Sequence, residues 1–578
     1  MFKSVNHSTP LAQSITAPRL KLPSGQLKRP KFKQRQIEQW ANELPIGNTT
    51  VAAHQMLDKL KALNEARYSY KERLQIHNSL RPVFNELLHA IRTPLRQANL
   101  PMDQQHLYRA QLMQDLLDQM AMGYKHVASE LCLLPRLKEY DQFLLTESIY
   151  MAIIYLGQRL VDSYGVYAPE PETVWQDLNQ LYRYATARQL HSQQIDDVMP
   201  DTPLPVALTI DFAYKRILLL SLAEPYHLMQ YEADDMFRLI ASMVESCVVE
   251  PFQEIVTRGE YVLDLDSDHG PRYMESDHQE SFSDPRIIEI TAVKNQLNTH
   301  IQRLLASNAQ QAEFEAVSLV ERQQRDMLLR LADAWDASLV RKNPRFDLAA
   351  KVEVTAGLNA AHYYISEGNS FTPEMDELRL VNNLDIDNTK NDSVIAIAYR
   401  DAIQKDRKHD NQSYSLNPWA QRNISPIGIA INCPIGQGTL DIRVGELITY
   451  RVIGKKLSRW QIGVTRWLKH EFHEAGAGNV HAGIMNLANG AIPVGTKAIT
   501  GLGNGTDYFR SLMIPKQVSL QQTRSLIVPA LLYDVGTVIT VNLRQRIFYA
   551  RLTRMVLSTR SFTQFDFEVI KRPMEFEL

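Results

Sequence analysis

The hydrophobic period of this chain changes once, close to Pro344, and that change limits the possible folds more than any other feature. From about residue 38 to 338, apolar residues recur every three or four positions, as they do in helices that pack against one another. After Pro344, apolar and polar residues alternate in short runs, which is typical of β-strands. We therefore expect an α+β multidomain protein, with an N-terminal all-α helical bundle followed by C-terminal antiparallel β-structure.

The alternating runs are short, evenly spaced and separated by Gly, Asn and Pro turns. This pattern favours a small antiparallel β-barrel with a further β extension after it. The polar stretch 366–420 interrupts the pattern and predicts a long insertion. The expected strands are 351–358, 428–432, 446–453, 459–468, 479–487, 526–533, 537–543, 547–557 and 562–570.

The composition excludes several classes of protein. With a net charge of −2, the chain lacks the strongly basic character of proteins that coat nucleic acid. Its three cysteines, Cys132, Cys247 and Cys433, form no CxxC pair and suit a reducing compartment. No segment reaches the roughly 18 uninterrupted apolar residues of a membrane span, and the first residues lack the apolar core of a secretory signal. We expect a cytoplasmic protein.

Residues 1–37 form a basic segment. Eight Lys or Arg and no acidic residue occur among the first 36 positions, so this segment can contact phosphate or anionic lipid. Because Pro and Ser interrupt it and no amphipathic period is present, we expect a disordered tail. An RNA- or DNA-associated protein that binds through this tail is one alternative function, and its affinity would fall steeply with salt.

Two short motifs flank the insertion. In RKNPR (341–345), Arg341 and Arg345 lie on either side of a proline that keeps the segment out of a helix interior. Arginine recognises phosphate in a bidentate manner and also pairs with guanine O6 and N7, so the loop is suited to a compact anion. In NISPIG (423–428), two polar side chains are spaced two apart and would face the same side of a strand.

The pair of motifs resembles the signature of the PilZ domain, which is RxxxR followed by (D/N)xSxxG. The resemblance covers about 341–490, because the strands expected after NISPIG are similar to the latter half of such a barrel. It implies a PilZ-like antiparallel β-barrel that binds cyclic di-GMP, a bacterial second messenger with two guanines and two phosphates. It implies no metal and no cofactor besides this ligand.

The resemblance also implies a role for each motif residue. Arg341 and Arg345 would hold the phosphates and stack on or hydrogen-bond guanine. Asn423 and Ser425 would contact base and phosphate edges. Gly428 would let the strand turn beneath the ligand, since a Cβ atom would block a close approach there.

One departure from the family pattern concerns the spacing. Seventy-seven residues (346–422) separate the motifs, so the insertion has to return the chain beside the first strand, which the slow growth of loop-closure entropy permits. Other basic residues lie nearer the second motif and compete for the role of the arginine pair. We favour Arg341 and Arg345, because a strand follows them and the competitors lack RxxxR spacing. The competitors are Arg400, Lys405, Arg407 and Lys408.

Each motif also has an ordinary structural interpretation. RKNPR can be a solvated linker between the helical and β regions, and NISPIG can be an Asx turn that enters a strand. A barrel that keeps the fold but has lost the ligand would then act as a scaffold through protein contacts alone. The binding hypothesis rests on the two motifs occurring together in the family order.

Other apparent sites are weaker. The acidic run 264–275 imitates a calcium loop but has His269 where glycine is required. HEFHE (470–474) is not HExxH, and GLGNGT (501–506) lacks the lysine of a phosphate-binding loop. No GxSxG or other nucleophile setting is present. The sequence therefore predicts no metal site and no enzyme activity.

Together these features predict a cyclic di-GMP receptor in which a PilZ-like barrel relays ligand binding to a helical domain. The helical domain would bind an unidentified protein partner and so control motility, type IV pili or surface attachment. No nucleic acid polymer is expected as a partner. The predicted parts are a disordered basic tail (1–37), a helical domain (38–338), the PilZ-like barrel (339–490) and a C-terminal β extension (491–578).

Overall fold

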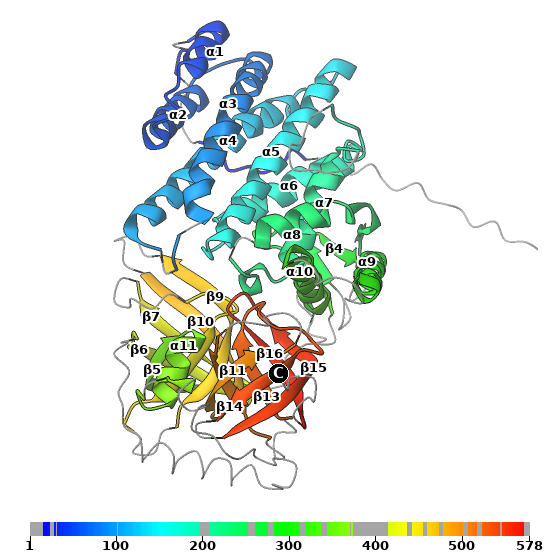
Figure 1. The fold of residues 1–578 in the computed structure, drawn as a ribbon. Coiled ribbons are helices and arrows are strands. Elements are labelled where there is room, and N and C mark those ends of the chain that lie inside the picture. The colour runs from blue at the N-terminus through cyan, green and yellow to red at the C-terminus, as the bar shows by residue number, and fades with distance from the viewer. Residues whose placement is uncertain are drawn as a thin grey trace, which may run out of the picture.

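The computed structural model has a helical domain stacked on two β-barrels that lie side by side (Figure 1). The predicted α+β class, with a helical region followed by antiparallel β-structure, is confirmed. No helix in the described part of the chain is long and apolar enough to cross a membrane. The structure describes residues 16–23, 28–30, 32–96, 98–100, 102–196, 207–230, 232–252, 261–274, 282–311, 319–336, 344–369, 371–373, 414–435, 442–454, 459–472, 478–500, 507–516, 523–543 and 546–571.

The helical domain packs long amphipathic helices around α5, which is buried along most of its length. Polar N-caps begin several helices; for example, the Asp103 side chain accepts a hydrogen bond from the His106 backbone N–H at the start of α4. The helices are α1 (Gln34–Asn42), α2 (Thr49–Asn64), α3 (Tyr70–Arg96), α4 (Gln104–Cys132), α5 (Glu139–Gly165), α6 (Val174–Ala187), α7 (Ile210–Leu222), α8 (Glu232–Ile240), α9 (Thr291–Gln311) and α10 (Leu319–Trp335), with 3-10 turns η1 (Pro225–His227) and η2 (Val244–Ser246).

A small antiparallel sheet interrupts the helical region and was not predicted. Its strands are two to five residues long, too short to produce a readable alternation of apolar and polar residues. They pair in the order β1-β4-β2-β3. The strands are β1 (Val248–Pro251), β2 (Tyr261–Asp264), β3 (Arg272–Tyr273) and β4 (Pro285–Glu289).

Part of the segment predicted to be a disordered tail lies against the helical domain. The Lys21 backbone N–H donates to Asp177 Oδ1 at 2.9 Å, and the Lys125 ammonium donates to the Lys21 carbonyl at 3.0 Å. Farther along, the Tyr68 hydroxyl donates to the carbonyl of Phe32 at 2.7 Å. The physical reason is that a buried Lys–Asp pair still needs hydrogen-bond partners, and the backbone of this basic segment supplies them.

The first barrel is closed, with the strand order β10-β7-β6-β5-β8-β9. Helix α11 (Leu358–Ile365) follows β5, and β6 begins at Asn417, so the predicted insertion 366–420 runs four residues too far into a strand. The strands are β5 (Phe346–Ala356), β6 (Asn417–Ser425), β7 (Gly428–Pro434), β8 (Leu447–Val452), β9 (Gln461–Phe472) and β10 (Gly478–Ala488).

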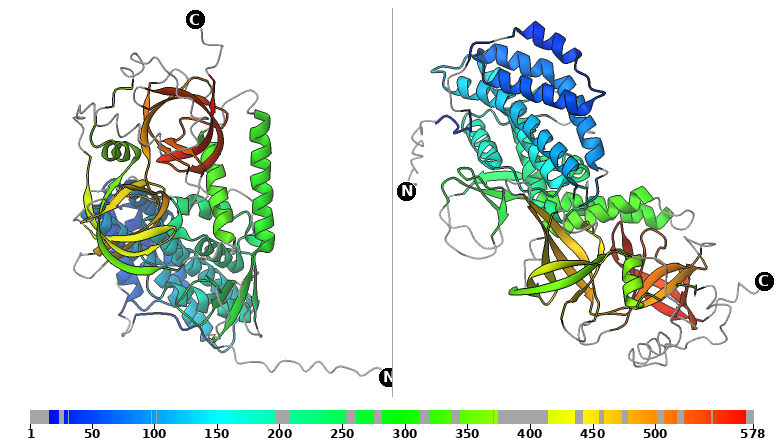
Figure 2. Two further views of the ribbon diagram at one scale, coloured as in Figure 1. Left: turned by 90° about the horizontal axis from the view of Figure 1, so that it is seen from below. Right: turned by 90° about the vertical axis from the view of Figure 1, so that its left-hand side faces the viewer.

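The segment predicted as a β extension closes into a second barrel, with the order β11-β12-β13-β16-β15-β14 (Figure 2, left). Closure leaves no strand edge free to pair with another chain. The strands are β11 (Ile492–Ala498), β12 (Phe509–Ile514), β13 (Ser525–Pro529), β14 (Val538–Asn542), β15 (Ile547–Ser558) and β16 (Phe562–Ile570).

The three parts are packed against one another. One hydrophobic core runs through the helical domain and into the first barrel. Strand β9 extends beyond β8, and there its backbone bonds the helical domain: the His470 N–H donates to the Tyr167 carbonyl at 2.8 Å. Between the barrels, α11 contributes Leu358 and Ala361 to a core shared with Leu512 of β12. This packing gives a change in one part a physical route to the others.

Candidate functional site

The pairing of β5 with β6 brings the two sequence motifs together. Phe346 pairs with Ile424 and Asp347 pairs with Asn423 in an antiparallel register. Arg345 directly precedes Phe346, so the same register continued by one residue places Arg345 opposite Ser425. The Arg345 side chain is exposed, and Asn423 and Ser425 are half-buried.

These polar residues lie on the outer face of the barrel. Asn423 pairs with Ala430 of β7, whereas the neighbouring Ile429 and Ile431 point into the hydrophobic core. Since side chains alternate along a strand, Asn423 and Ser425 share the outer face with Asp347. The Ser425 hydroxyl donates to the Gly428 carbonyl at 3.1 Å and so closes the β6–β7 turn.

Gly428 has a packing role. A Cβ atom at this position would lie 2.1 Å from the carbonyl oxygen of Ile484 on β10, so only glycine allows β7 and β10 to approach this closely. From the sequence, Gly428 was expected to let the backbone approach a ligand closely, because it has no Cβ atom. The close approach in the structure is to the backbone of the next strand.

The insertion departs from the barrel and returns to it at the end opposite the motifs. At the opposite end of the strand pair, Val354 pairs with Asn417, so the chain departs after β5 and returns to β6 at that end. The chain between them therefore begins and ends nearly the full length of β5 away from Arg345. This arrangement explains how 77 residues can separate two motifs whose strands are adjacent.

Several sequence candidates lie outside the described residues. They include Arg341, the first arginine of the loop. The competing basic residues of the insertion also lie outside the described part of the chain. These are Arg400, Lys405, Arg407 and Lys408.

Arg422 is a residue of this face that the sequence analysis missed. Gln421 pairs with Ile431 and Asn423 with Ala430, so Arg422 is the extra residue of a β-bulge, a feature that re-aims side chains. Its side chain is exposed, and Nη1 lies 3.4 Å from Nδ1 of His481, whose Nε2 lies 2.9 Å from Glu471 Oε2. A single arginine before NISPIG could not be identified from the sequence as a residue of this face. The position of a bulge depends on how the strand pairs with its partner, here β7.

Exposed apolar side chains surround the arginine end of the strand pair. Phe346 is 60% exposed and Ile427 58%, and Leu348 and Ile424 are also exposed. Large apolar residues on a surface beside cationic and amide groups offer contact area to a flat aromatic ligand. The end of β5 and β6 therefore combines charge, hydrogen-bonding groups and apolar surface.

The metal-like motif 470–474 has a structural role where it is described. His470 Nδ1 lies 2.9 Å from the Val166 carbonyl, and burial lowers the pKa of His470 to about 4. His481, the third histidine near this motif, pairs with Glu471, with 2.9 Å between Nε2 and Oε2. Among the described residues no group of three His, Cys, Asp or Glu side chains is placed to hold a metal ion.

Three family models match successive parts of the chain. Residues 35–253 match "Cyclic-di-GMP receptor FimW, N-terminal domain", residues 261–412 match the "middle PilZ domain" of the same receptor, and residues 494–570 match "FimW C-terminal beta-barrel domain".

The middle part of the chain, residues 261–412, is therefore similar to a PilZ domain.

A curated relative is similar over almost the whole length. The "Cyclic-di-GMP receptor FimW" of Pseudomonas aeruginosa is 24% identical over 575 residues, which span 92% of this chain and 90% of the relative. No solved structure matches the chain. The match of the PilZ model contains the RKNPR loop and ends before NISPIG, so the PilZ assignment of the second motif rests on the register of β5 and β6.

Proposed function

We propose that this chain is a receptor for cyclic di-GMP, which binds on the outer face of the PilZ barrel at the arginine end of β5 and β6. The observation that carries the proposal is the register that sets Arg345 opposite Ser425, although 77 residues separate the motifs. The similarity to a relative named as a cyclic di-GMP receptor supports the same ligand.

The chemistry of this face suits a guanine dinucleotide. Arg341 and Arg345 supply planar donors for phosphate oxygens and for guanine O6 and N7. Asn423 offers both a donor and an acceptor to a base edge, and Ser425 offers a hydroxyl. Arg422, on the same face, supplies a further cation. The exposed Phe346 lies at the same end of the strand pair but, by alternation, on the other face from Asn423.

The link from this site to the helical domain runs through α10. Trp335 at its end is fully buried, and its indole N–H donates to the Leu219 carbonyl at 3.3 Å. Arg330 on the same helix pairs with Glu232 of α8. Only residues 336–345 join this anchored helix to β5, so closure of the arginine loop on a ligand would act directly on α10. Ligand drives such a change only as far as it binds the closed state better.

The output would be a change in the surface that the helical domain offers to a protein partner. We propose a cytoplasmic signalling protein without enzyme activity, whose partner belongs to the machinery of motility, pili or attachment. The family resemblance supports this assignment, and the similarity to a cyclic di-GMP receptor supports the receptor role. A scaffold with a ligand-free barrel would use the same helical surface without the messenger.

Isothermal titration calorimetry with cyclic di-GMP tests the proposal. Wild-type protein should bind with micromolar or tighter affinity, and Arg341→Ala and Arg345→Ala should each weaken binding roughly tenfold or more, as expected for lost charge-assisted hydrogen bonds. Arg459→Ala is the matched control, because Arg459 is exposed and precedes β9 on the same barrel. Absence of binding heat in the wild type would leave the scaffold as the function.

A further inference from the structure

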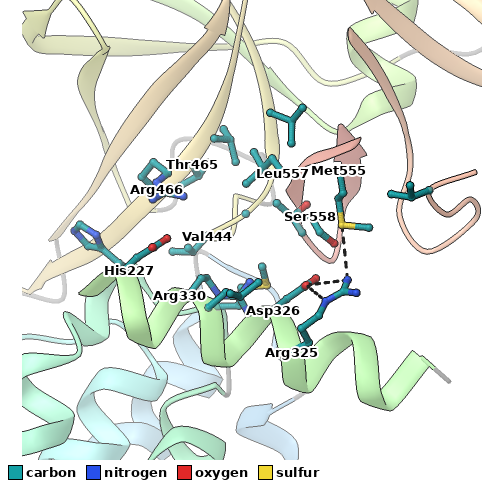
Figure 3. A pocket seen from close by; sticks show the side chains of 18 of the residues that line it. His227, Arg325, Asp326, Arg330, Val444, Thr465, Arg466, Met555, Leu557 and Ser558 are labelled. Carbon is teal, nitrogen blue, oxygen red and sulfur yellow. Dashed lines mark hydrogen bonds and ion pairs between the residues drawn. The ribbon is translucent and has the colours of Figure 1, made fainter. Parts of the chain in front are cut away.

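A second concave site lies where the helical domain and the two barrels meet (Figure 3). It encloses a volume of about 350 Å³, within the rough range of 300–1,000 Å³ typical of small-molecule pockets. Helix α10 forms one wall, β9 of the first barrel another and β15 of the second barrel a third. None of the described motif residues (Arg345, Asn423, Ser425 and Gly428) lines it.

The walls of this junction cavity are largely apolar. Leu329 of α10, Val535 before β14 and Val556 of β15 are 42%, 50% and 44% exposed, and all three line the cavity. Large aliphatic side chains left open to solvent on three separate elements indicate a surface that an apolar body would cover. Met229 and Met555 add adaptable surface.

Hydrogen-bond donors converge on the same cavity. Ile484 pairs with Thr465 and Gly483 with Trp467, so Arg466 is the extra residue of a bulge in β9 and projects toward α10 (Figure 3). Thr465 is 1% exposed, and its hydroxyl has no partner in the described structure. A buried hydroxyl without a partner costs free energy that an entering ligand can recover.

The buried unpartnered groups of the cavity favour an anionic ligand. Arg330 bonds Glu232 through Nη2, but its buried Nε has no acceptor among the described residues. Asp326 is engaged by Arg325, and the Asp534 carboxylate accepts the N–H of the following residue at 2.8 Å. The charge of Asp333 acts on Arg466, although no ion pair joins the two side chains in the described structure. The buried groups without a partner in the described structure are therefore the Arg330 Nε–H and the Thr465 hydroxyl, and both can donate to an anion, whereas the Asp333 carboxylate is exposed to solvent.

We propose that the junction cavity binds a small amphipathic organic anion, with its apolar body against Leu329, Val535 and Val556 and its carboxylate or sulfonate on Arg466 and Thr465. Such a ligand contacts all three parts of the molecule. Helix α10 precedes the arginine loop in the chain, so binding in the junction cavity should change the affinity of the messenger site. By linkage, binding of the messenger should change the affinity of the cavity by the same factor.

Fluorescence of 8-anilinonaphthalene-1-sulfonate with the full chain tests this site. The probe should bind once per chain, and decanoate should displace it at least tenfold more effectively than decanol, which lacks the charge. Arg466→Gln should weaken probe binding at least tenfold, and Leu329→Trp should abolish it by filling the cavity. Arg551→Gln is the control, because Arg551 is exposed and lies nearer the start of β15, outside the cavity. This variant should bind the probe like the wild type.

Two results would overturn the proposal. One is equal probe binding in wild type, Arg466→Gln and Leu329→Trp at unchanged melting temperature. The other is equal displacement by decanoate and decanol, which needs no variant and therefore does not depend on folding of the mutants. Neither measurement involves cyclic di-GMP, so the outcome is independent of the proposed receptor function.

Discussion

Lys125 and Asp177 form an ion pair in the interior of the helical domain, with 2.7 Å between Nζ and Oδ2 and both side chains only 2% exposed. The other carboxylate oxygen of Asp177 accepts the backbone N–H of Lys21, and the Lys125 ammonium also donates to the Lys21 carbonyl. The pair is therefore fully bonded only when the N-terminal segment is in place.

Removal of one partner of this pair should destabilise the protein strongly. Asp177→Leu leaves the Lys125 charge buried without a counter-ion, at a cost of about 3–5 kcal/mol. The double variant Lys125→Met/Asp177→Leu should recover most of that loss, because no buried charge remains. Urea unfolding followed by circular dichroism measures both, and equal destabilisation by the single and double variants would contradict the prediction.

Stability should fall between pH 6.5 and pH 5, through three buried histidines. Burial lowers the pKa of His77, His126 and His470 to about 4, against 6.5 for the unfolded chain. The unfolded chain therefore binds more protons in this range, so the free energy of unfolding rises with pH and is lost as the pH drops. Each histidine should remove about 2 kcal/mol by pH 5.

Thermal unfolding at a series of pH values checks this dependence. His126→Phe should make the decline between pH 6.5 and pH 5 shallower, because one of the three titrating histidines is gone. His227→Phe is the control. His227 is half-exposed, so this substitution removes no buried histidine and should leave the slope unchanged. An unchanged slope in His126→Phe would show that other groups control the acid response.

Gly428→Ala should lower stability as well as ligand binding. The new methyl group would overlap the Ile484 carbonyl of β10, so the β7–β10 pair has to separate, at a cost of about 1–3 kcal/mol. Gly47→Ala is the control, since nothing lies within 4 Å of a Cβ atom there. A variant with the wild-type melting temperature but no binding of cyclic di-GMP would instead assign Gly428 to ligand contact alone.

Arg422→Ala should weaken binding of cyclic di-GMP by roughly three- to fivefold, the effect expected of one exposed charge contact. His481→Ala should produce a smaller loss, because it removes only the group beside which Arg422 lies. Titration calorimetry at fixed ionic strength compares the two with the wild type. Equal affinity in Arg422→Ala would exclude the bulge residue from the site while leaving the arginine loop in place.

The fold could be predicted from periodicity wherever elements are long. The change of period at Pro344 divides the helical domain from the barrels, and the expected strand 562–570 coincides with β16. The strands β1 to β4 were missed because they are too short to show a period. Closure of the second barrel was missed as well, since alternation within a strand says nothing about which strand its last edge will meet.

The candidate site was predicted in part. Spacing alone indicated that Asn423 and Ser425 share a face, and the register gives them that face together with Asp347. The family resemblance implied that Arg345 and Ser425 lie close together, and the register of β5 with β6, continued by one residue, places them opposite each other. Arg422 and Arg466 could not be predicted, and the reason is the same for both. Each is the extra residue of a β-bulge, and the position of a bulge depends on the register of two paired strands, which the sequence does not give.

The departure and return of the chain at one end of β5 and β6, where Val354 meets Asn417, makes the PilZ barrel a practical host for a reporter. A fluorescent protein spliced between α11 and β6 would leave the barrel from the end remote from Arg345. Its termini would join the chain near the Val354–Asn417 end of the strand pair, away from the proposed messenger site. A biosensor built in this way would report binding of the messenger without blocking the proposed binding site.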